Sequence, residues 1–142
     1  MSNKIINLQL LRLTNSLLAL SFLFFYQVSN KNIYEIILAG CLIVTIILSQ
    51  LFWANPIRFS IIHKMDGIVA KLALSLFIGY VVFVKKMDII LFYLFLILIV
   101  WMIFFFLLSD FNSRKEWCCN NHILYHAISH IFCFAGSLFA FM

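Results

Sequence analysis

The stretch that decides the fold is Ile89–Leu108, which reads IILFYLFLILIVWMIFFFLL and contains no charged residue. An α-helix rises about 1.5 Å per residue, so about 20 apolar residues cross the hydrocarbon core of a bilayer. A soluble protein would have to bury such a helix on every side, and a chain of 142 residues is too short to do so. The stretch therefore predicts a transmembrane helix.

The rest of the sequence extends this prediction to the whole chain. Hydrophobic residues make up 65% of it and charged residues only 11%, whereas soluble domains carry about 25% charged residues. Four further stretches are long and apolar enough to span a membrane: Leu8–Gln27, Ile33–Trp53, Gly67–Val84 and His122–Met142. We therefore predict an all-α integral membrane bundle of about five transmembrane helices, in a single domain that covers residues 1–142.

The basic residues predict how the bundle lies in the membrane. Ser29–Asn32 and Lys85–Asp88 are short connections, whereas Ala54–Asp66 and Ser109–Asn121 are longer and hold most of the charge. Five crossings place the N-terminus and both longer connections on one side, with Lys4, Arg12, Arg58, Lys64, Arg114 and Lys115. The other side carries Lys31, Lys85 and Lys86. The positive-inside rule makes the first side cytoplasmic.

The net charge of +5 does not indicate nucleic-acid binding. The basic residues are scattered singly or in pairs at the ends of helices, where they favour anionic lipid head groups. The partners that we expect are membrane lipids and, as an alternative, other membrane subunits.

Polar residues inside apolar stretches are costly in a bilayer, and here they gather at one depth. The second stretch ends at the cytoplasmic side and carries a row of polar or amphipathic residues at every fourth position: Cys41, Thr45, Ser49 and Trp53. The fifth begins at that side with histidines at the same spacing: His122, His126 and His130. The third begins there with Asp66, while the fourth contributes none and is predicted to face lipid. This clustering predicts a site at the inner interface.

Two histidines four residues apart point to the same side of a helix and can bind one metal ion. His122 and His126 meet this condition, and His63 is the nearest candidate for the third ligand of an open zinc site. Asp66 would orient a ligand or hold a metal-bound water, and Ser49 would hydrogen-bond that water or a substrate oxygen. Axial ligation of haem by one of the two paired histidines is a further interpretation.

Each of these residues also has a purely structural interpretation. His63 can lie among lipid head groups, Ser49 can bond to its own helix backbone, and Asp66 can be the N-terminal cap of the third helix. His130 lies two turns inside the membrane, where a hydrogen bond between helices is the simpler role. The residues by themselves leave both sets of interpretations open.

The run His122-Ile-Leu-Tyr-His126-Ala-Ile-Ser129 resembles the last-helix motif of a membrane hydrolase superfamily. That superfamily includes alkaline ceramidases, progestin and adipoQ receptors, and haemolysin III-like proteins. Its motif is His-x-x-x-His with a Ser or Thr shortly after it. A Ser-x-x-x-His late in the second helix and an Asp at the start of the third complete the family's site. Ser49 and Asp66 match the Ser and the Asp, whereas Trp53 stands where the first His is expected.

The resemblance implies a zinc ion held by three histidines, which activates water to cleave an amide or related bond in a lipid. We therefore hypothesise a zinc-dependent membrane hydrolase that acts on a lipid amide or ester at the inner interface, within lipid metabolism. Its catalytic residues would be Asp66 and Ser49, and its zinc ligands His63, His122 and His126. The alternative is a non-enzymatic small subunit of a larger membrane complex. The family has seven helices, and removal of one antiparallel pair would leave five with both chain ends on their original sides.

Overall fold

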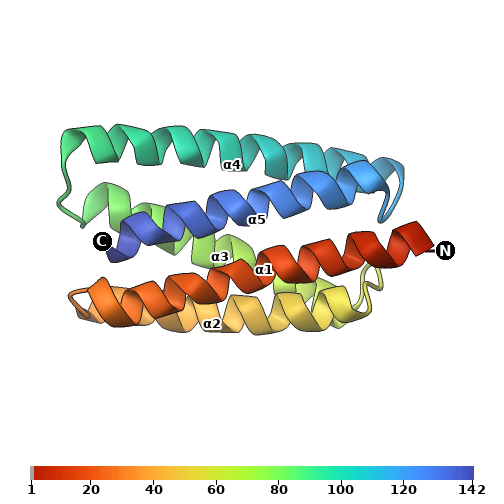
Figure 1. Cartoon of the computed structure of the whole chain (residues 1–142), viewed down its shortest axis with the longest axis horizontal. Coiled ribbons are helices and arrows are strands. Elements are labelled where there is room, and N and C mark those ends of the chain that lie inside the picture. Colours follow the sequence, from red (N-terminus) through yellow and green to blue (C-terminus); the bar gives the residue numbers. More distant parts are fainter. Residues whose placement is uncertain (1) are drawn as a thin grey trace.

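The computed structural model describes residues 2–142, with side chains from Leu8 onward. This part of the chain forms five long α-helices and no strand (Figure 1). They are α1 (Ser2–Val28), α2 (Ile33–Ala54), α3 (Ile61–Phe83), α4 (Ile89–Lys115) and α5 (Asn120–Phe141). Each contains a segment long and apolar enough to cross a membrane. The predicted all-α bundle of transmembrane helices is therefore confirmed.

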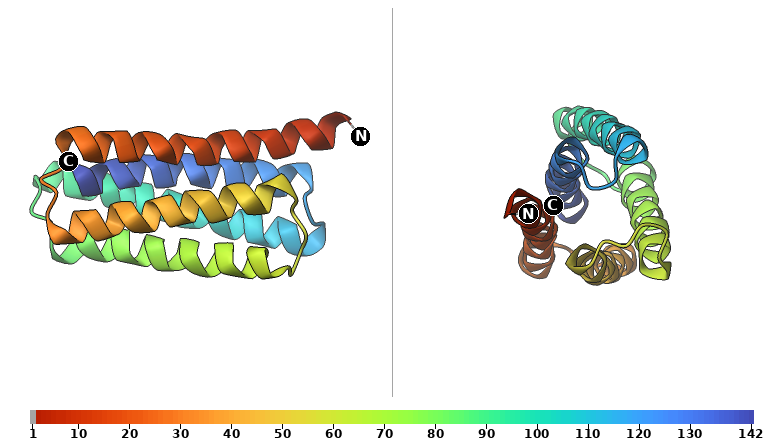
Figure 2. Two further views of the ribbon diagram at one scale, coloured as in Figure 1. Left: turned by 90° about the horizontal axis from the view of Figure 1, so that it is seen from below. Right: turned by 90° about the vertical axis from the view of Figure 1, so that its right-hand side faces the viewer.

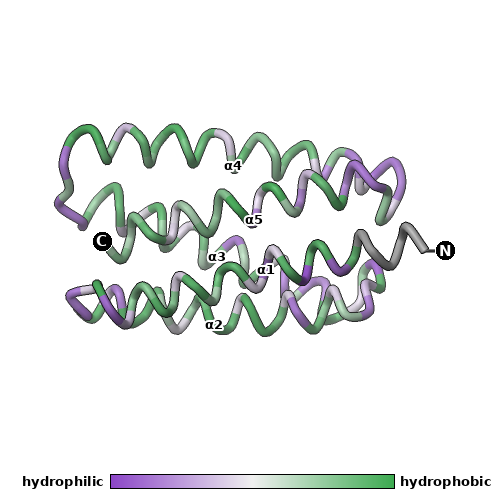
Figure 3. The backbone as a smooth tube through the Cα atoms, viewed as in Figure 1, coloured by the Kyte–Doolittle hydropathy of each residue, from purple (hydrophilic) through white to green (hydrophobic). Residues whose placement is uncertain are grey.

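The helices run up and down, so the bundle has two distinct ends (Figure 1). The N-terminal end holds the starts of α1, α3 and α5, and the C-terminal end holds the starts of α2 and α4. Hydrophobic residues dominate along the helices, and hydrophilic residues concentrate toward the two ends (Figure 3). Large apolar side chains are exposed on the outside, such as Leu13, Phe83 and Val100. Such a surface fits contact with lipid.

α3 begins earlier than the sequence predicts, at Ile61 instead of Gly67. The hydroxyl of Ser60 is the N-cap, because it accepts a hydrogen bond from the backbone N–H of His63 at 3.1 Å. That bond satisfies one of the amides left open at a helix start. Asp66 therefore lies in the second turn of α3 and is not its cap. His63 lies in the first turn of the helix and not in a loop.

α4 continues beyond its predicted end at Leu108 as far as Lys115. Its polar side chains bond to carbonyls of the same helix: Asn112 donates to Leu108 and Ser113 donates to Asp110, each at 2.7 Å. These side chains are satisfied within the helix, so the polar segment stays helical. The two connections that the sequence predicts to be long shrink to residues 55–60 and 116–119.

The packing of the helices leaves the bundle open on one side. α5 packs along α1 and α4, and α2 packs along α1 and α3. α3 touches α5 at few positions and barely meets α4, although the two helices follow one another in the chain. Seen from the end, the helices form a ring around an interior (Figure 2). The junction of α3 with α4 is the least packed part of that ring.

A buried polar network around Glu35 closes the C-terminal end of the bundle. The Glu35 carboxylate accepts hydrogen bonds from Ser29 at 2.6 Å and from Tyr80 at 2.7 Å, and Lys85 Nζ lies 3.2 Å from it. Lys85 also donates to the carbonyl of Ala140 near the end of α5, at 2.7 Å. Because the charged groups satisfy one another, they are tolerated away from water. The expectation that all strongly polar groups lie at one depth is therefore wrong, since this cluster lies at the opposite end.

Candidate functional site

A cavity of about 330 Å³ lies inside the ring of helices. Its size falls within the range of roughly 300–1,000 Å³ that is typical of small-molecule sites. The candidate site residues line its wall near the N-terminal end: Ser49, His63, Asp66, His122 and His126. Apolar side chains of α3 and α4 line the part nearer the C-terminal end: Phe77, Ile78, Phe95 and Ile99. The cavity is therefore amphipathic along its length.

The structure brings together all five residues that the sequence singled out. Ser49 comes from α2, His63 and Asp66 from α3, and His122 and His126 from α5. These helices meet the cavity at the same end because α2 ends there while α3 and α5 begin there. The topology is therefore what gathers the side chains.

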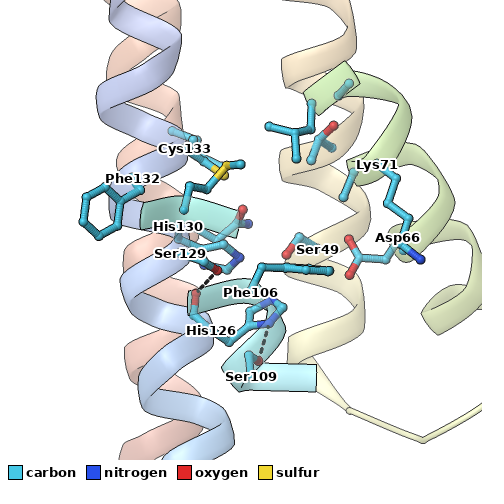
Figure 4. A pocket seen from close by; sticks show the side chains of 18 of the residues that line it. Ser49, Asp66, Lys71, Phe106, Ser109, His126, Ser129, His130, Phe132 and Cys133 are labelled. Atoms are coloured by element: carbon cyan, nitrogen blue, oxygen red, sulfur yellow. Dashed lines mark hydrogen bonds between the residues drawn. The ribbon is translucent and has the colours of Figure 1, made fainter. Parts of the chain in front are cut away.

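Ser49 and Asp66 have no hydrogen-bond or ion-pair partner among the residues that the structure describes. Figure 4 shows the Asp66 carboxylate turned toward Ser49 from the neighbouring helix. Ser49 is buried, and it does not bond to its own helix backbone in the way that Thr45 does, which donates to Cys41 at 2.8 Å. Both groups are thus available to a ligand in the cavity.

His126 is held by Ser109 of α4. The Ser109 hydroxyl donates its one proton to the carbonyl of His122 at 3.3 Å, and its oxygen lies 3.2 Å from Nδ1 of His126. When the hydroxyl proton points to that carbonyl, the oxygen accepts a hydrogen bond from Nδ1–H of His126, and Nε2 is then unprotonated. His130 has the same arrangement with Thr14 of α1, which donates to Leu11 and lies 3.2 Å from the imidazole Nδ1. This contact bears out the expected helix–helix hydrogen bond of His130.

His63 and His122 are held in the opposite way, by backbone donors. The N–H of Phe59 donates to Nδ1 of His63 at 3.0 Å, and the N–H of Cys118 donates to Nδ1 of His122 at 3.2 Å. A backbone N–H can only donate a hydrogen bond, so each Nδ1 must accept it with its lone pair. In a neutral imidazole the proton then lies on Nε2.

These protonation states bear on the predicted zinc site. A zinc-binding histidine gives its lone pair to the metal and donates its other N–H to a neighbour. His126 meets that description at Nε2, whereas His63 and His122 present Nε2–H. The described residues also contain no group of three or more His, Cys, Asp or Glu side chains arranged to hold a metal ion. The predicted ligands therefore do not fit zinc in this arrangement, and zinc dependence stays a prediction.

Trp53 occupies the position where the family resemblance places a histidine. Its ring packs 5.1 Å from the ring of His126 and 6.0 Å from that of His122, measured between centroids. The side chain is only 2% exposed, and Nε1 has no hydrogen-bond partner within the described part of the chain. Trp53 therefore fills the space between α2 and the histidine face of α5.

Three residues that line the site were not predicted from the sequence. The fourth stretch was predicted to face lipid, but Ser109 and Ser113 of α4 are buried and line the cavity. Their spacing of four residues, just beyond the apolar run, was the available signal. The third is Trp117, whose ring centroid lies 5.1 Å from the rings of both His63 and His122. Its Nε1 donates to the Pro56 carbonyl.

No family model, curated protein or solved structure matches the chain. The membrane hydrolase superfamily remains a resemblance of single residues. The function must be inferred from the side chains that surround the cavity.

Proposed function

We propose that this protein is a membrane hydrolase that admits a lipid into its cavity and cleaves an amide or ester bond beside Asp66 and Ser49. The observation that carries the proposal is one amphipathic cavity, with the unpartnered side chains of Ser49 and Asp66 near one end and mostly apolar walls toward the other. Polar residues of the farther wall, such as Thr45 and Ser137, donate to carbonyls of their own helices. Such a cavity matches a ligand with a polar head and an apolar chain. The weakly packed junction of α3 with α4 is the entry route that we favour.

The length of the cavity supports a single acyl chain as the apolar part of the ligand. On α5 the lining runs from His122 to Ser137, which corresponds to about 22 Å of helix. One leaflet of a bilayer offers roughly 15 Å of hydrocarbon. The cavity is therefore long enough to enclose the whole of an acyl chain whose head lies at the polar end. Such an acyl chain would end before the closed C-terminal end of the bundle. The basic asymmetry of the chain predicts that the polar end lies in the cytoplasmic leaflet.

Hydrolysis would add water across the amide or ester bond, with Asp66 as general base. Asp66 takes a proton from water, whose oxygen attacks the carbonyl carbon while the π electrons move to the carbonyl oxygen. When this tetrahedral intermediate collapses, the bond to nitrogen or oxygen breaks, and the leaving amine or alcohol takes the proton from Asp66. Ser49 orients the water, because its hydroxyl has no other partner among the described residues.

The test is turnover of a single-chain N-acyl amide and of the matching ester by the detergent-purified protein, measured as release of the fatty acid. We expect Asp66→Asn to lower turnover by roughly 100-fold or more, the usual contribution of a general base. Asp88→Asn is the matched control, since Asp88 caps α4 at the opposite end and accepts from the Ile90 N–H at 2.8 Å. Asn and Asp are comparable caps, so this control should keep full turnover. Equal turnover in both variants would remove Asp66 from the mechanism.

The subunit hypothesis has one observation in its favour. Arg12, Ser16 and Gln50 form a hydrogen-bonded group on the exposed side of α1 and α2, with Gln50 Nε2 donating to Ser16 at 2.9 Å. Polar groups at membrane depth are typical of contacts with another helix. Cross-linking from a photoreactive residue at Leu13 tests this, with Val100 on α4 as the control position. A specific adduct from Leu13 alone, without lipid turnover, would favour the subunit.

A further inference from the structure

α3 and α5 begin with the same local structure, which the sequence does not make obvious. In each, the residue before the N-cap has a positive φ, 65° at Phe59 and 59° at Cys118. The next residue is the N-cap, and its side chain accepts from the backbone N–H three positions later. In both helices that third position is a histidine, His63 or His122. The two histidines therefore occupy equivalent places at the N-terminal end.

Each histidine completes the turn by bonding back to the residue before the cap. Nδ1 of His63 accepts from Phe59 N–H, and Nδ1 of His122 accepts from Cys118 N–H. This resembles a capping box, in which the side chain at that helical position bonds back to a backbone amide before the helix. The positive φ of the turn is uncommon for residues other than glycine, and this bond helps to hold it. The caps thereby fix the ring orientation and the tautomer of both imidazoles.

The fixed tautomer leaves the Nε2–H group of each imidazole available to a ligand in the cavity. Both side chains line the cavity, and the hydrogen bonds that their rings make with the described residues are at Nδ1 and not at Nε2. His122 is 4% exposed, whereas His63 is only half-buried. The ring of Trp117 packs against both imidazoles. The polar end of the cavity thus carries two neutral N–H donors at two depths.

We propose that His63 and His122 are not metal ligands but N–H donors that bind acceptor oxygens in the polar head of the ligand. This proposal rests on the proposed function. It names the groups by which the site would recognise the polar head of the lipid. The buried His122 donates to the carbonyl oxygen of the amide or ester, and His63 donates to a head-group oxygen nearer the membrane surface. A preorganised N–H donor stabilises the negative charge that develops on a carbonyl oxygen when water attacks. Trp53, which cannot bind a metal, is compatible with such a site.

The test separates the capping role of His122 from its donor role. The amide oxygen of Asn lies close to the position of Nδ1 and accepts from Cys118 N–H, but Asn has no group in place of Nε2–H. His122→Asn should therefore keep the cap and lose the donor, whereas His122→Ala loses both. The probes are a single-chain N-acyl amide and a chain-matched alkyl ether that lacks the carbonyl oxygen. Binding of both is measured by calorimetry in the same detergent, alongside thermal unfolding.

We expect the wild-type protein to bind the amide roughly three- to tenfold more tightly than the ether, the size of one neutral hydrogen bond. His122→Asn should abolish that preference, leave the ether affinity unchanged and unfold near the wild-type temperature. Two-bond ¹⁵N–¹H spectra of histidine-labelled protein should show Nε2–H for His63 and His122.

Three outcomes would overturn the proposal. If His122→Asn keeps the preference for the amide, the donor role fails while lipid binding stands. If the spectra show Nδ1–H at His122, or one zinc per chain is lost in this variant, His122 is a ligand as the sequence predicted. If wild-type protein binds neither lipid, both the donor role and the proposed function fail.

Discussion

Replacement of Gly136 by leucine should shorten the cavity without disturbing the fold. Gly136 is buried on α5 and lines the cavity, yet a Cβ added there meets no atom within 4 Å. The open space beside this glycine is therefore the cavity itself. Gly136 lies ten positions after His126, which corresponds to about 15 Å along the helix. A leucine side chain at this depth would stop an acyl chain that starts at the polar end.

The hydrophobic effect sets how much affinity a long-chain ligand should lose in Gly136→Leu. Each buried methylene contributes about 0.8 kcal/mol, which is roughly fourfold in Kd. In the wild-type protein the affinity should rise by this factor with each added methylene until the cavity is full. In Gly136→Leu the rise should stop at shorter chains, so a ligand with two excluded methylenes binds about 15-fold more weakly than it binds the wild-type protein. Short chains should bind both proteins equally.

The assay is the binding of a homologous series of single-chain amides, measured by calorimetry in one detergent. Gly40→Leu is the matched control, because Gly40 is exposed on α2 and its added Cβ also meets nothing within 4 Å. Both substitutions raise helix propensity by about 1 kcal/mol, so neither variant should unfold earlier than the wild-type protein. If the plots of affinity against chain length coincide for all three proteins, the chain does not run toward Gly136 and the reasoning is refuted.

Three other predictions follow from the structure. Glu35→Gln should destabilise the protein by about 3 kcal/mol, because it leaves Lys85 as an uncompensated charge; thermal unfolding measures this, and Lys85→Met added to it should recover part of the loss. Single cysteines at Asn55 and Lys86, which are exposed at opposite ends of the bundle, should label from opposite sides of the membrane, and labelling from one side would contradict the five-span topology. Metal analysis should find far less than one zinc per chain, since His63 and His122 present Nε2–H; one zinc lost in both His122→Ala and His126→Ala would support the zinc site of the sequence analysis.

The start of α3 and the end of α4 differ from the ends that the sequence predicts. It placed the start of α3 at Gly67 because hydropathy registers only the apolar part of a helix, whereas Ser60 caps the helix at Ile61. For the same reason it ended α4 at Leu108, although Asn112 and Ser113 bond to their own helix. Polar side chains that satisfy a helix from within leave no hydropathy signal. The buried Glu35 was overlooked because its partners, Tyr80 and Lys85, lie far away in the chain.

The sequence by itself determined the membrane environment, the five spans and the end of the bundle at which Ser49, Asp66 and the paired histidines gather. Those properties follow from apolar length and from the alternating direction of the helices, which need no knowledge of packing. Tertiary structure decided which helices leave a gap, that α4 contributes Ser109 to the cavity, and which nitrogen each histidine presents. The last of these cannot be read from a His-x-x-x-His spacing, because it depends on whether Nδ1 meets a backbone amide or a hydroxyl. His122 and His126 share a helix face and a motif, yet their neighbours in space make one a donor to the cavity and the other an acceptor.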